Sequence, residues 1–298
     1  MAIKTGVNTD WLDTSKAMPV AKSDHITRKW LNVPYGKGPL QQLDIFLPEE
    51  GEGPFPLIID VHGGGLTGCD KHDFHLYPMF WALQQGFAAA SINYRLSPAV
   101  KYPEHLYDVK RAVLFLFKHA EEYKVDRNNF FLWGTSAGGN LVLMAGLKKG
   151  LPLPEDIRAA NDVPIRAAAG ISAATGLDKW GKGGKSLQER IMLKLMTIGL
   201  YEKVLGIKKP TVEQLKQSDP TSYLSDGTVP LYLQHGDMDG AVPIEAMLKY
   251  AEIAKAVLPA EDLVVDIIPG AKHAGDGPEF LKEEHTLPIL KFFRNHTV

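Results

Sequence analysis

The stretch "LWGTSAGGN", residues 132–140, places a small hydroxyl between glycines, where an apolar run passes into a helical pattern. Residues 134–138, GTSAG, fit G-x-S-x-G, in which a serine occupies a sharp turn between a strand and a helix. Glycine is needed on both sides because a side chain there would meet the neighbouring strand or helix. The helix start also directs backbone N–H groups at the point where negative charge would develop. The stretch therefore predicts a nucleophilic Ser136, although a turn that merely requires glycine has the same pattern.

A serine nucleophile needs a base, and the base needs an acid that orients it. In one known chain order of such residues, the serine is followed by the acid and then by the histidine, each just after a strand. The segment "YLQHGDMDGAVP", residues 232–243, offers Asp237 and Asp239 after an apolar run. The segment "IIPGAKHAGDGP", residues 267–278, offers His273 in a loop flanked by glycines.

The chain has ten histidines, and their positions in the pattern separate them. His285 lies within a helical pattern, whereas His62 and His235 belong to the ends of other strands. Of the ten, only His273 lies in the loop directly after the last predicted strand. Loop aspartates and single loop histidines are usually ordinary surface residues, but that reading does not account for three correct residue types in the correct order.

The segment "DVHGGGLTG", residues 60–68, follows an early buried strand. Its glycines would let backbone N–H groups approach a substrate carbonyl oxygen with no Cβ in the way, as an oxyanion hole requires. A flexible loop is the alternative interpretation, which the position after a buried strand and upstream of the nucleophile disfavours.

Short apolar runs alternate with helical patterns along the rest of the chain. The predicted strands are 42–48, 56–63, 87–95, 129–134, 165–172, 230–236 and 263–270. The predicted helices are 104–123, the segment after Ser136, 243–257 and 278–296. This alternation predicts an α/β fold with a mostly parallel central sheet and helices on both faces.

Two segments depart from that rhythm. Residues 1–30 are polar and weakly patterned, which suggests an N-terminal arm. Residues 173–222 combine the Gly/Lys-rich "DKWGKGGKS" (178–186) with a helical stretch. This segment is longer than a single crossover helix needs, so we expect a small cap or lid inserted over one end of the sheet. A long surface loop is the alternative. We expect a single domain over residues 1–298.

The composition of the chain excludes several classes of function. A net charge of −2 gives no electrostatic case for nucleic acid or an anionic membrane surface, and one cysteine, Cys69, excludes an internal disulfide. The first residues lack a secretory apolar region, and no apolar run approaches the ~20 residues of a membrane span. We expect a cytoplasmic protein that binds neither nucleic acid nor membrane, with a homodimer possible through the cap or the last helix.

Taken together, five motifs resemble those of the α/β-hydrolase esterases, in the hormone-sensitive-lipase-like branch. They are "HGGG" (62–65), "NYRLSP" (93–98), "GTSAGG" (134–139), "HGDMDGAVP" (235–243) and "GAKH" (270–273). Longer segments are most similar to bacterial acetyl esterases and to bifunctional acetylxylan/feruloyl esterases. The resemblance covers about residues 32–295 and implies an α/β-hydrolase fold.

The resemblance also implies roles for particular residues. Ser136 is then the nucleophile, His273 the base and Asp239, rather than Asp237, the acid. The oxyanion hole is formed by the amides of Gly64 and Gly65 and of Ala137, the residue after the nucleophile. Many relatives carry an aromatic residue after the glycines, where this chain has Leu66, which loosens inference about the acyl pocket.

The expected activity is serine carboxylic-ester hydrolysis through an acyl-enzyme, with no metal and no cofactor. Short acyl esters are the expected substrates, above all acetyl groups on a carbohydrate such as a xylo-oligosaccharide. Alternatives within the class are a feruloyl esterase, a broad-specificity carboxylesterase or lipase, and hydrolysis of amides or lactones. A ligand-binding pseudohydrolase or an interaction protein built on residues 173–222 is a non-enzymatic alternative, which the presence of His273 disfavours.

Overall fold

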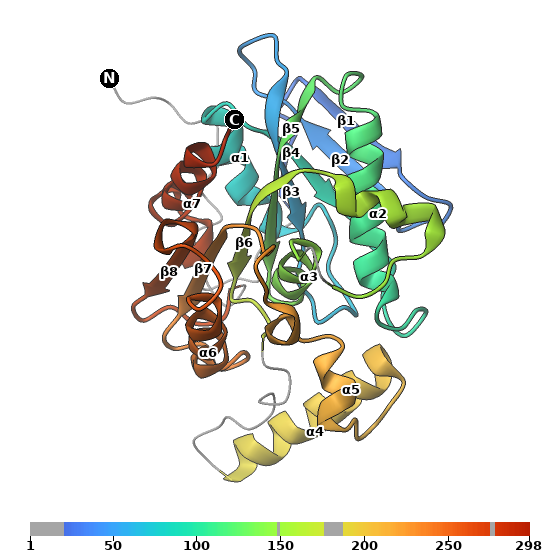
Figure 1. Cartoon of the computed structure of the whole chain (residues 1–298), viewed down its shortest axis with the longest axis vertical. Coiled ribbons are helices and arrows are strands. Elements are labelled where there is room, and N and C mark those ends of the chain that lie inside the picture. Colours follow the sequence, from blue (N-terminus) through green and yellow to red (C-terminus); the bar gives the residue numbers. More distant parts are fainter. Residues whose placement is uncertain (1–20, 148–149, 176–186, 275–277) are drawn as a thin grey trace.

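The centre of the computed structural model, which describes residues 21–147, 150–175, 187–274 and 278–298, is an eight-stranded sheet (Figure 1). The strand order is β1-β2-β4-β3-β5-β6-β7-β8. β2 runs antiparallel to both β1 and β4, and the strands from β4 to β8 are parallel. The strands are β1 Lys29–Pro34, β2 Gln42–Phe46, β3 Phe55–Val61, β4 Ala88–Ile92, β5 Val125–Thr135, β6 Ile165–Ile171, β7 Leu231–Gly236 and β8 Leu263–Ile268.

Successive side chains of a strand point to opposite faces of the sheet, and helices cover both faces. The central strands therefore carry mainly apolar side chains on both faces. In β3, Leu57 and Ile59 face one core cluster and Ile58 faces the other, and all three are fully buried. This explains why the central strands appear in the sequence as continuous apolar runs.

Helices cover both faces of this sheet. One cluster joins the sheet to α2 Glu104–Lys118, α3 Ala137–Ala145 and α6 Ile244–Ala254. The other joins it to α1 Tyr77–Gln84 and α7 Glu283–Asn295, which pack against each other. The predicted mostly parallel sheet with helices on both faces is therefore confirmed.

The elements that were not predicted include the strand β1 and the helix α1. β1 begins at Lys29, inside the segment expected to form an arm, and pairs with β2. α1 was missed because every residue from Tyr77 to Leu83 is buried, so no polar face marks it as a helix. Of the expected arm, residues 1–20 lie outside the described part of the chain.

Two helices from the expected cap lie beyond the lower end of the sheet in Figure 1: α4 Leu187–Leu205 and α5 Val212–Lys216. The C-terminal turn of α4 is attached to the loop before α2. Lys101 Nζ donates to the carbonyls of Glu202 (3.2 Å) and Lys203 (2.6 Å), and Tyr102 N donates to Val204 O (2.9 Å). The Gly/Lys-rich segment 178–186 falls outside the described residues.

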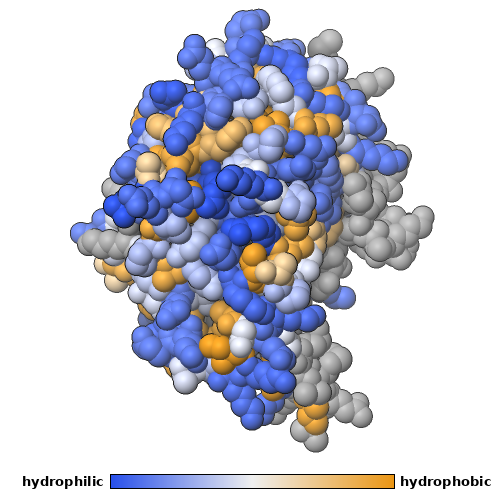
Figure 2. All heavy atoms as spheres, turned by 90° about the vertical axis from the view of Figure 1, so that its right-hand side faces the viewer, coloured by the Kyte–Doolittle hydropathy of each residue, from blue (hydrophilic) through white to orange (hydrophobic). Residues whose placement is uncertain are grey.

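The surface on the α2 side is mainly hydrophilic, with apolar residues in small separate patches (Figure 2). None of the helices in the described ranges combines the length and the hydrophobicity that a membrane crossing requires.

Candidate active site

Ser136 lies between β5 and α3. Its backbone, with φ 57° and ψ −116°, has a conformation that residues other than glycine rarely adopt. The two glycines of the motif make this turn possible. A Cβ on Gly134 would lie 2.3 Å from Gly138 O, and one on Gly138 would lie 2.0 Å from Val61 O. Both distances are far below van der Waals contact, so the sequence requirement for glycine has a steric cause. The turn leaves Ser136 half-buried at the carboxyl edge of the sheet.

Three of the residues singled out in the sequence form a hydrogen-bonded chain at this edge. His273 Nε2 lies 2.9 Å from Ser136 Oγ, and His273 Nδ1 lies 2.7 Å from Asp239 Oδ2. The His273 side chain is 15% exposed, whereas that of Asp239 is fully buried. Asp237 does not join them: it is exposed, and its Oδ1 accepts from Gly270 N at 2.6 Å.

A glycine also lets the loop that carries Asp239 and the loop that carries His273 approach each other. A Cβ on Gly236 would lie only 2.2 Å from Ala271 O. With no side chain there, the loops pair directly, and Met238 N donates to Ala271 O at 3.0 Å. The relative position of the loop after β7 and the loop after β8 is therefore fixed by backbone contacts.

The Asp239 carboxylate is held by four donors. Its Oδ1 accepts from Ala241 N (2.9 Å) and Val242 N (2.8 Å), and its Oδ2 accepts from His273 and lies 3.2 Å from His235 Nε2. Burial of Asp239 opposes ionisation, but the hydrogen bonds from His235 and His273 outweigh it and hold the pKa of this carboxyl well below its usual range. The group is therefore an ionised acceptor near neutral pH.

His235 is a contact that the sequence reasoning missed. Its side chain is fully buried, and Nε2 lies 3.0 Å from Val242 O as well as 3.2 Å from Asp239. Both partners can only accept a hydrogen bond, so Nε2 carries a hydrogen and donates it. Its position at the end of β7, directly before the glycine of the HG-x-x-D pattern, is the one sequence signal that could have revealed it.

The predicted oxyanion amides lie on two elements that meet beside Ser136. Gly64 (φ 87°) and Gly65 (φ 61°) have backbone conformations that favour glycine, and Ala137 is the first residue of α3. The N–H groups at a helix start have no partner within the helix. Within the described ranges, the amides of Gly64 and Gly65 likewise donate to no backbone carbonyl outside helices and strands.

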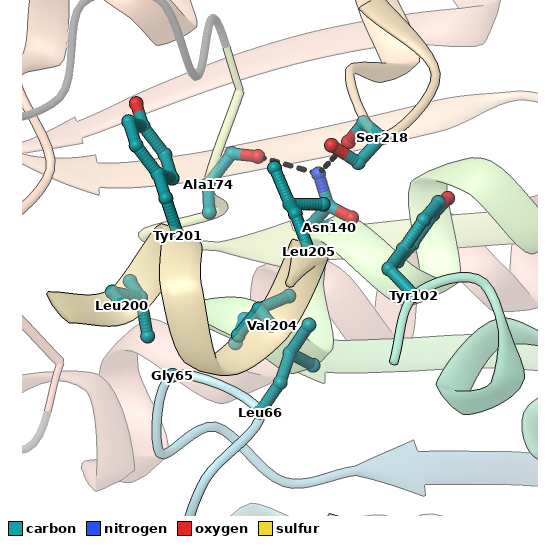
Figure 3. Close-up of a pocket in the computed structure, with 11 residues that line it drawn as sticks. Gly65, Leu66, Tyr102, Asn140, Ala174, Leu200, Tyr201, Val204, Leu205 and Ser218 are labelled. Carbon is teal, nitrogen blue, oxygen red and sulfur yellow. Dashed lines mark hydrogen bonds between the residues drawn. The ribbon is translucent and has the colours of Figure 1, made fainter. Parts of the chain in front are cut away.

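A cavity of about 40 Å³ adjoins these amides and is lined by Gly65 and Ala137 (Figure 3). Its remaining walls are mostly apolar; they are Leu66, Tyr102, Asn140, Ala174, Leu200, Tyr201, Val204, Leu205 and Ser218. In Figure 3, α4 lines the cavity with the side chains of Leu200, Tyr201, Val204 and Leu205, and dashed lines join Asn140 to Ala174 and Ser218. Asn140 Nδ2 donates to Ala174 O (2.7 Å) and Ser218 O (2.8 Å). The cavity therefore lies between the sheet edge and the segment expected to be a cap.

Solved structures share this architecture. A truncated carbohydrate esterase from gut microbiota superposes with a TM-score of 0.78 at 20% identity, covering 93% of this chain and 99% of that one. An acetyl ester-xyloside bifunctional hydrolase from Caldicellulosiruptor lactoaceticus gives 0.67 at 22% identity, covering 94% and 96%. At these identities the likeness establishes the α/β-hydrolase fold.

Comparison with known sequences identifies the family to which the chain belongs. Esterase LipC from Mycobacterium tuberculosis is 26% identical over 271 residues, which are 88% of this chain but only 63% of LipC. The chain thus spans about 60% of the length of such curated relatives. The BD-FAE family matches residues 43–252, more than half of the chain. The family resemblance expected from the motifs is confirmed, and the chain belongs to the BD-FAE family of α/β-hydrolase-fold proteins.

Proposed function

We propose that this protein is a serine carboxylic-ester hydrolase that removes short acyl groups, acetyl above all, from carbohydrate-sized alcohols. The observation that carries the proposal is the hydrogen-bonded chain from Ser136 through His273 to Asp239. Each of these side chains lies within hydrogen-bonding distance of the next, which supports the assignment of Ser136 as nucleophile, His273 as base and Asp239 as acid. Ala137, the residue after Ser136, lines a small apolar cavity.

In the proposed reaction, His273 Nε2 accepts the proton of Ser136 as Oγ attacks the ester carbonyl. The bond to the alcohol then breaks, and His273 returns the proton to the leaving oxygen. Water attacks the acyl-enzyme with the same base, which releases the acid and restores Ser136. Asp239 keeps the hydrogen of the resting imidazole on Nδ1 and stabilises the imidazolium that forms in each step.

The amides of Gly64, Gly65 and Ala137 are the proposed donors to the oxyanion. Their N–H groups are fixed by the backbone before substrate arrives, so little reorganisation accompanies the reaction. Loss of one such donor typically lowers turnover about 10²–10³-fold.

The size and lining of the cavity indicate how long an acyl group the site accepts. Leu66 closes it from the loop after β3, while Leu200 and Val204 close it from α4. The small volume of the cavity and its apolar walls favour a short acyl group over a long chain or an aromatic ring. Residues 173–222 are on this proposal a cap that sets the depth of the acyl site.

The alcohol is proposed from the similar structures, whose titles name a carbohydrate esterase and an acetyl ester-xyloside hydrolase. Feruloyl-ester and broad carboxylesterase activity are the alternatives, and the small cavity disfavours both. A pseudohydrolase is disfavoured by the complete chain of hydrogen bonds. The cytoplasmic location and the homodimer stay predictions from the sequence.

The test is kcat/KM for the p-nitrophenyl esters of acetate, butyrate, octanoate and dodecanoate, measured beside acetylated xylo-oligosaccharides and methyl ferulate. We expect acetate to lead the ester series and acetylated sugars to exceed methyl ferulate. A preference for octanoate or longer chains of about tenfold, equal to about 1.4 kcal/mol, would replace the acetyl proposal with a lipase-like carboxylesterase.

A further inference from the structure

Three side chains with metal-binding atoms converge on the loop between β3 and the short 3-10 helix η2, Phe74–Leu76. Cys69, Asp73 and His75 each offer one such atom, and these atoms lie within 4.8 Å of one another. None of the three belongs to the proposed triad or oxyanion hole. The cluster combines a thiol, a carboxylate and an imidazole, so it is neither a run of acidic residues nor an isolated cysteine.

The loop holds this cluster in place through its own hydrogen bonds. Asp73 Oδ1 lies 2.5 Å from His75 Nδ1 and Asp73 Oδ2 accepts from Asp70 N at 3.1 Å. Lys71, which lies between Asp70 and Asp73 in the sequence, is buried. Its backbone N donates a hydrogen bond to Asn93 Oδ1 at 2.7 Å. The ligand atoms are therefore brought together by the fold of the loop, which lowers the cost of ordering them around an ion.

The charges of the cluster suit a cation. The carboxylate of Asp73 and the sulfur of Cys69 lie within 4.8 Å of each other. A divalent cation is the species that a carboxylate and a thiolate bind together.

We propose that Cys69, Asp73 and His75 form an open binding site for a borderline divalent cation such as Zn²⁺. Thiolate, imidazole and carboxylate are the ligands that Zn²⁺ prefers, and three protein ligands leave a fourth position for water. On binding, the Cys69 thiol releases its proton to solvent and His75 ligates as neutral imidazole. One thiolate and one carboxylate then balance the charge of the ion.

Metal binding requires a rearrangement of the cluster. Metal bonds of about 2.0–2.3 Å place neighbouring ligand atoms of a tetrahedral site roughly 3.3–3.8 Å apart. Ligand atoms separated by as much as 4.8 Å must therefore close in by about 1–1.5 Å, whereas Asp73 Oδ1 and His75 Nδ1, which are 2.5 Å apart, must give up their hydrogen bond if both ligate. Side-chain rotation of Cys69, which is exposed, supplies such a closing movement.

The cluster also adjoins the glycine loop. A Cβ on Gly63 would lie 3.2 Å from both His75 Nε2 and Ser136 Cβ, and a Cβ on Gly64 would lie 2.8 Å from Cys69 Sγ. An ion held here would therefore act on the segment that carries two of the proposed oxyanion amides. The binding itself does not depend on the proposed function.

The experiment is a titration of the purified protein with Co²⁺, a spectroscopic substitute for Zn²⁺, followed by absorption in the near ultraviolet. Because the chain has a single cysteine, a thiolate-to-cobalt charge-transfer band can arise only from Cys69. We expect one bound ion per chain with this band, no band in Cys69→Ala, and an affinity at least about tenfold lower in Asp73→Asn and His75→Gln. His119→Gln, which alters an exposed histidine paired with Glu122, should bind as the wild type does.

A second readout needs no variant, which matters because His75 is buried and its replacement can perturb folding. Zn²⁺ should protect Cys69 of the wild-type protein from alkylation by iodoacetamide, measured by intact mass, whereas Mg²⁺, which prefers oxygen ligands, should not. Absence of both the cobalt band and the zinc protection in folded wild-type protein would overturn the proposal. So would stoichiometric Co²⁺ binding that persists in Cys69→Ala. Neither result bears on ester hydrolysis.

Discussion

Replacing Asp239 by asparagine should disable the base while leaving the site almost unchanged in shape. Oδ1 of Asp239 accepts from two backbone N–H groups, so the amide oxygen of asparagine must take that place. The NH₂ group then occupies the position of Oδ2 and faces His273 Nδ1 and His235 Nε2. His273 can meet a donor only with the lone pair of Nδ1, which puts its hydrogen on Nε2, where the Ser136 proton should go.

The expected loss follows from that change of tautomer. An acid-to-amide replacement that imposes the wrong tautomer lowers kcat about 10⁴-fold in a serine protease, or about 5 kcal/mol of transition-state stabilisation. We therefore expect Asp239→Asn to lose on the order of 10³–10⁴ in kcat for p-nitrophenyl acetate. The Nε2–H of His235 would face the new NH₂ group in a buried site, which should also lower the free energy of unfolding by about 1–3 kcal/mol.

Asp237→Asn is the matched control, because the residue is exposed and an amide oxygen can still accept from Gly270 N. It should retain activity within about threefold of the wild type, as surface substitutions usually change little. The assay is steady-state hydrolysis at neutral pH with protein concentrations corrected for the folded fraction by thermal unfolding. An Asp239→Asn enzyme within tenfold of the wild type, or a larger loss in Asp237→Asn, would refute the reasoning.

Three further substitutions test other parts of the structure. His235→Phe should lower kcat about tenfold or more, with little change in KM, because it removes a hydrogen bond worth about 1.5–3 kcal/mol from the ionised Asp239; a rise in KM at unchanged kcat would contradict this positioning role. Leu200→Trp should lower kcat/KM for a butyrate ester at least about tenfold relative to acetate by filling the cavity, and an unchanged ratio would place the acyl group elsewhere. Asp60 is fully buried, and its burial raises the pKa of this carboxyl well above its usual range. The folded state therefore keeps a proton that the unfolded chain loses above about pH 4, and the contribution of Asp60 to stability falls as pH rises. In urea unfolding, the free energy of unfolding should fall less between about pH 5 and pH 8 in Asp60→Asn than in the wild type, and equal decreases would count against a neutral Asp60.

The elements that could be predicted are those with a local physical signature. The turn around Ser136 is recognisable because the close approach of Gly134 and Gly138 to neighbouring backbone excludes any side chain. The central strands are recognisable because two covered faces require continuous apolar residues. His62, which the sequence pattern separates from His273, has a buried ring that stacks on Tyr94 with the ring centroids 4.4 Å apart.

The features that could not be predicted depend on partners distant in the sequence. α1 has no polar face because α7, at the other end of the chain, covers it. The link between His235 and Asp239 is formed by the bend of the loop after β7, which the residue types alone do not specify. Cavity depth depends on how α4 lies against Gly65, where a Cβ would come 3.5 Å from Leu200 Cδ1.

The most direct test of the account is the rate of p-nitrophenyl acetate hydrolysis by Ser136→Ala, measured on protein whose thermal unfolding matches that of the wild type. Alanine keeps the backbone of the turn and removes only the hydroxyl that lies 2.9 Å from His273 Nε2. If Ser136 is the nucleophile, turnover should fall by about 10⁴–10⁶-fold, as in other hydrolases that lose a triad member. A variant that retains a tenth of the wild-type rate would show that the reaction proceeds without Ser136.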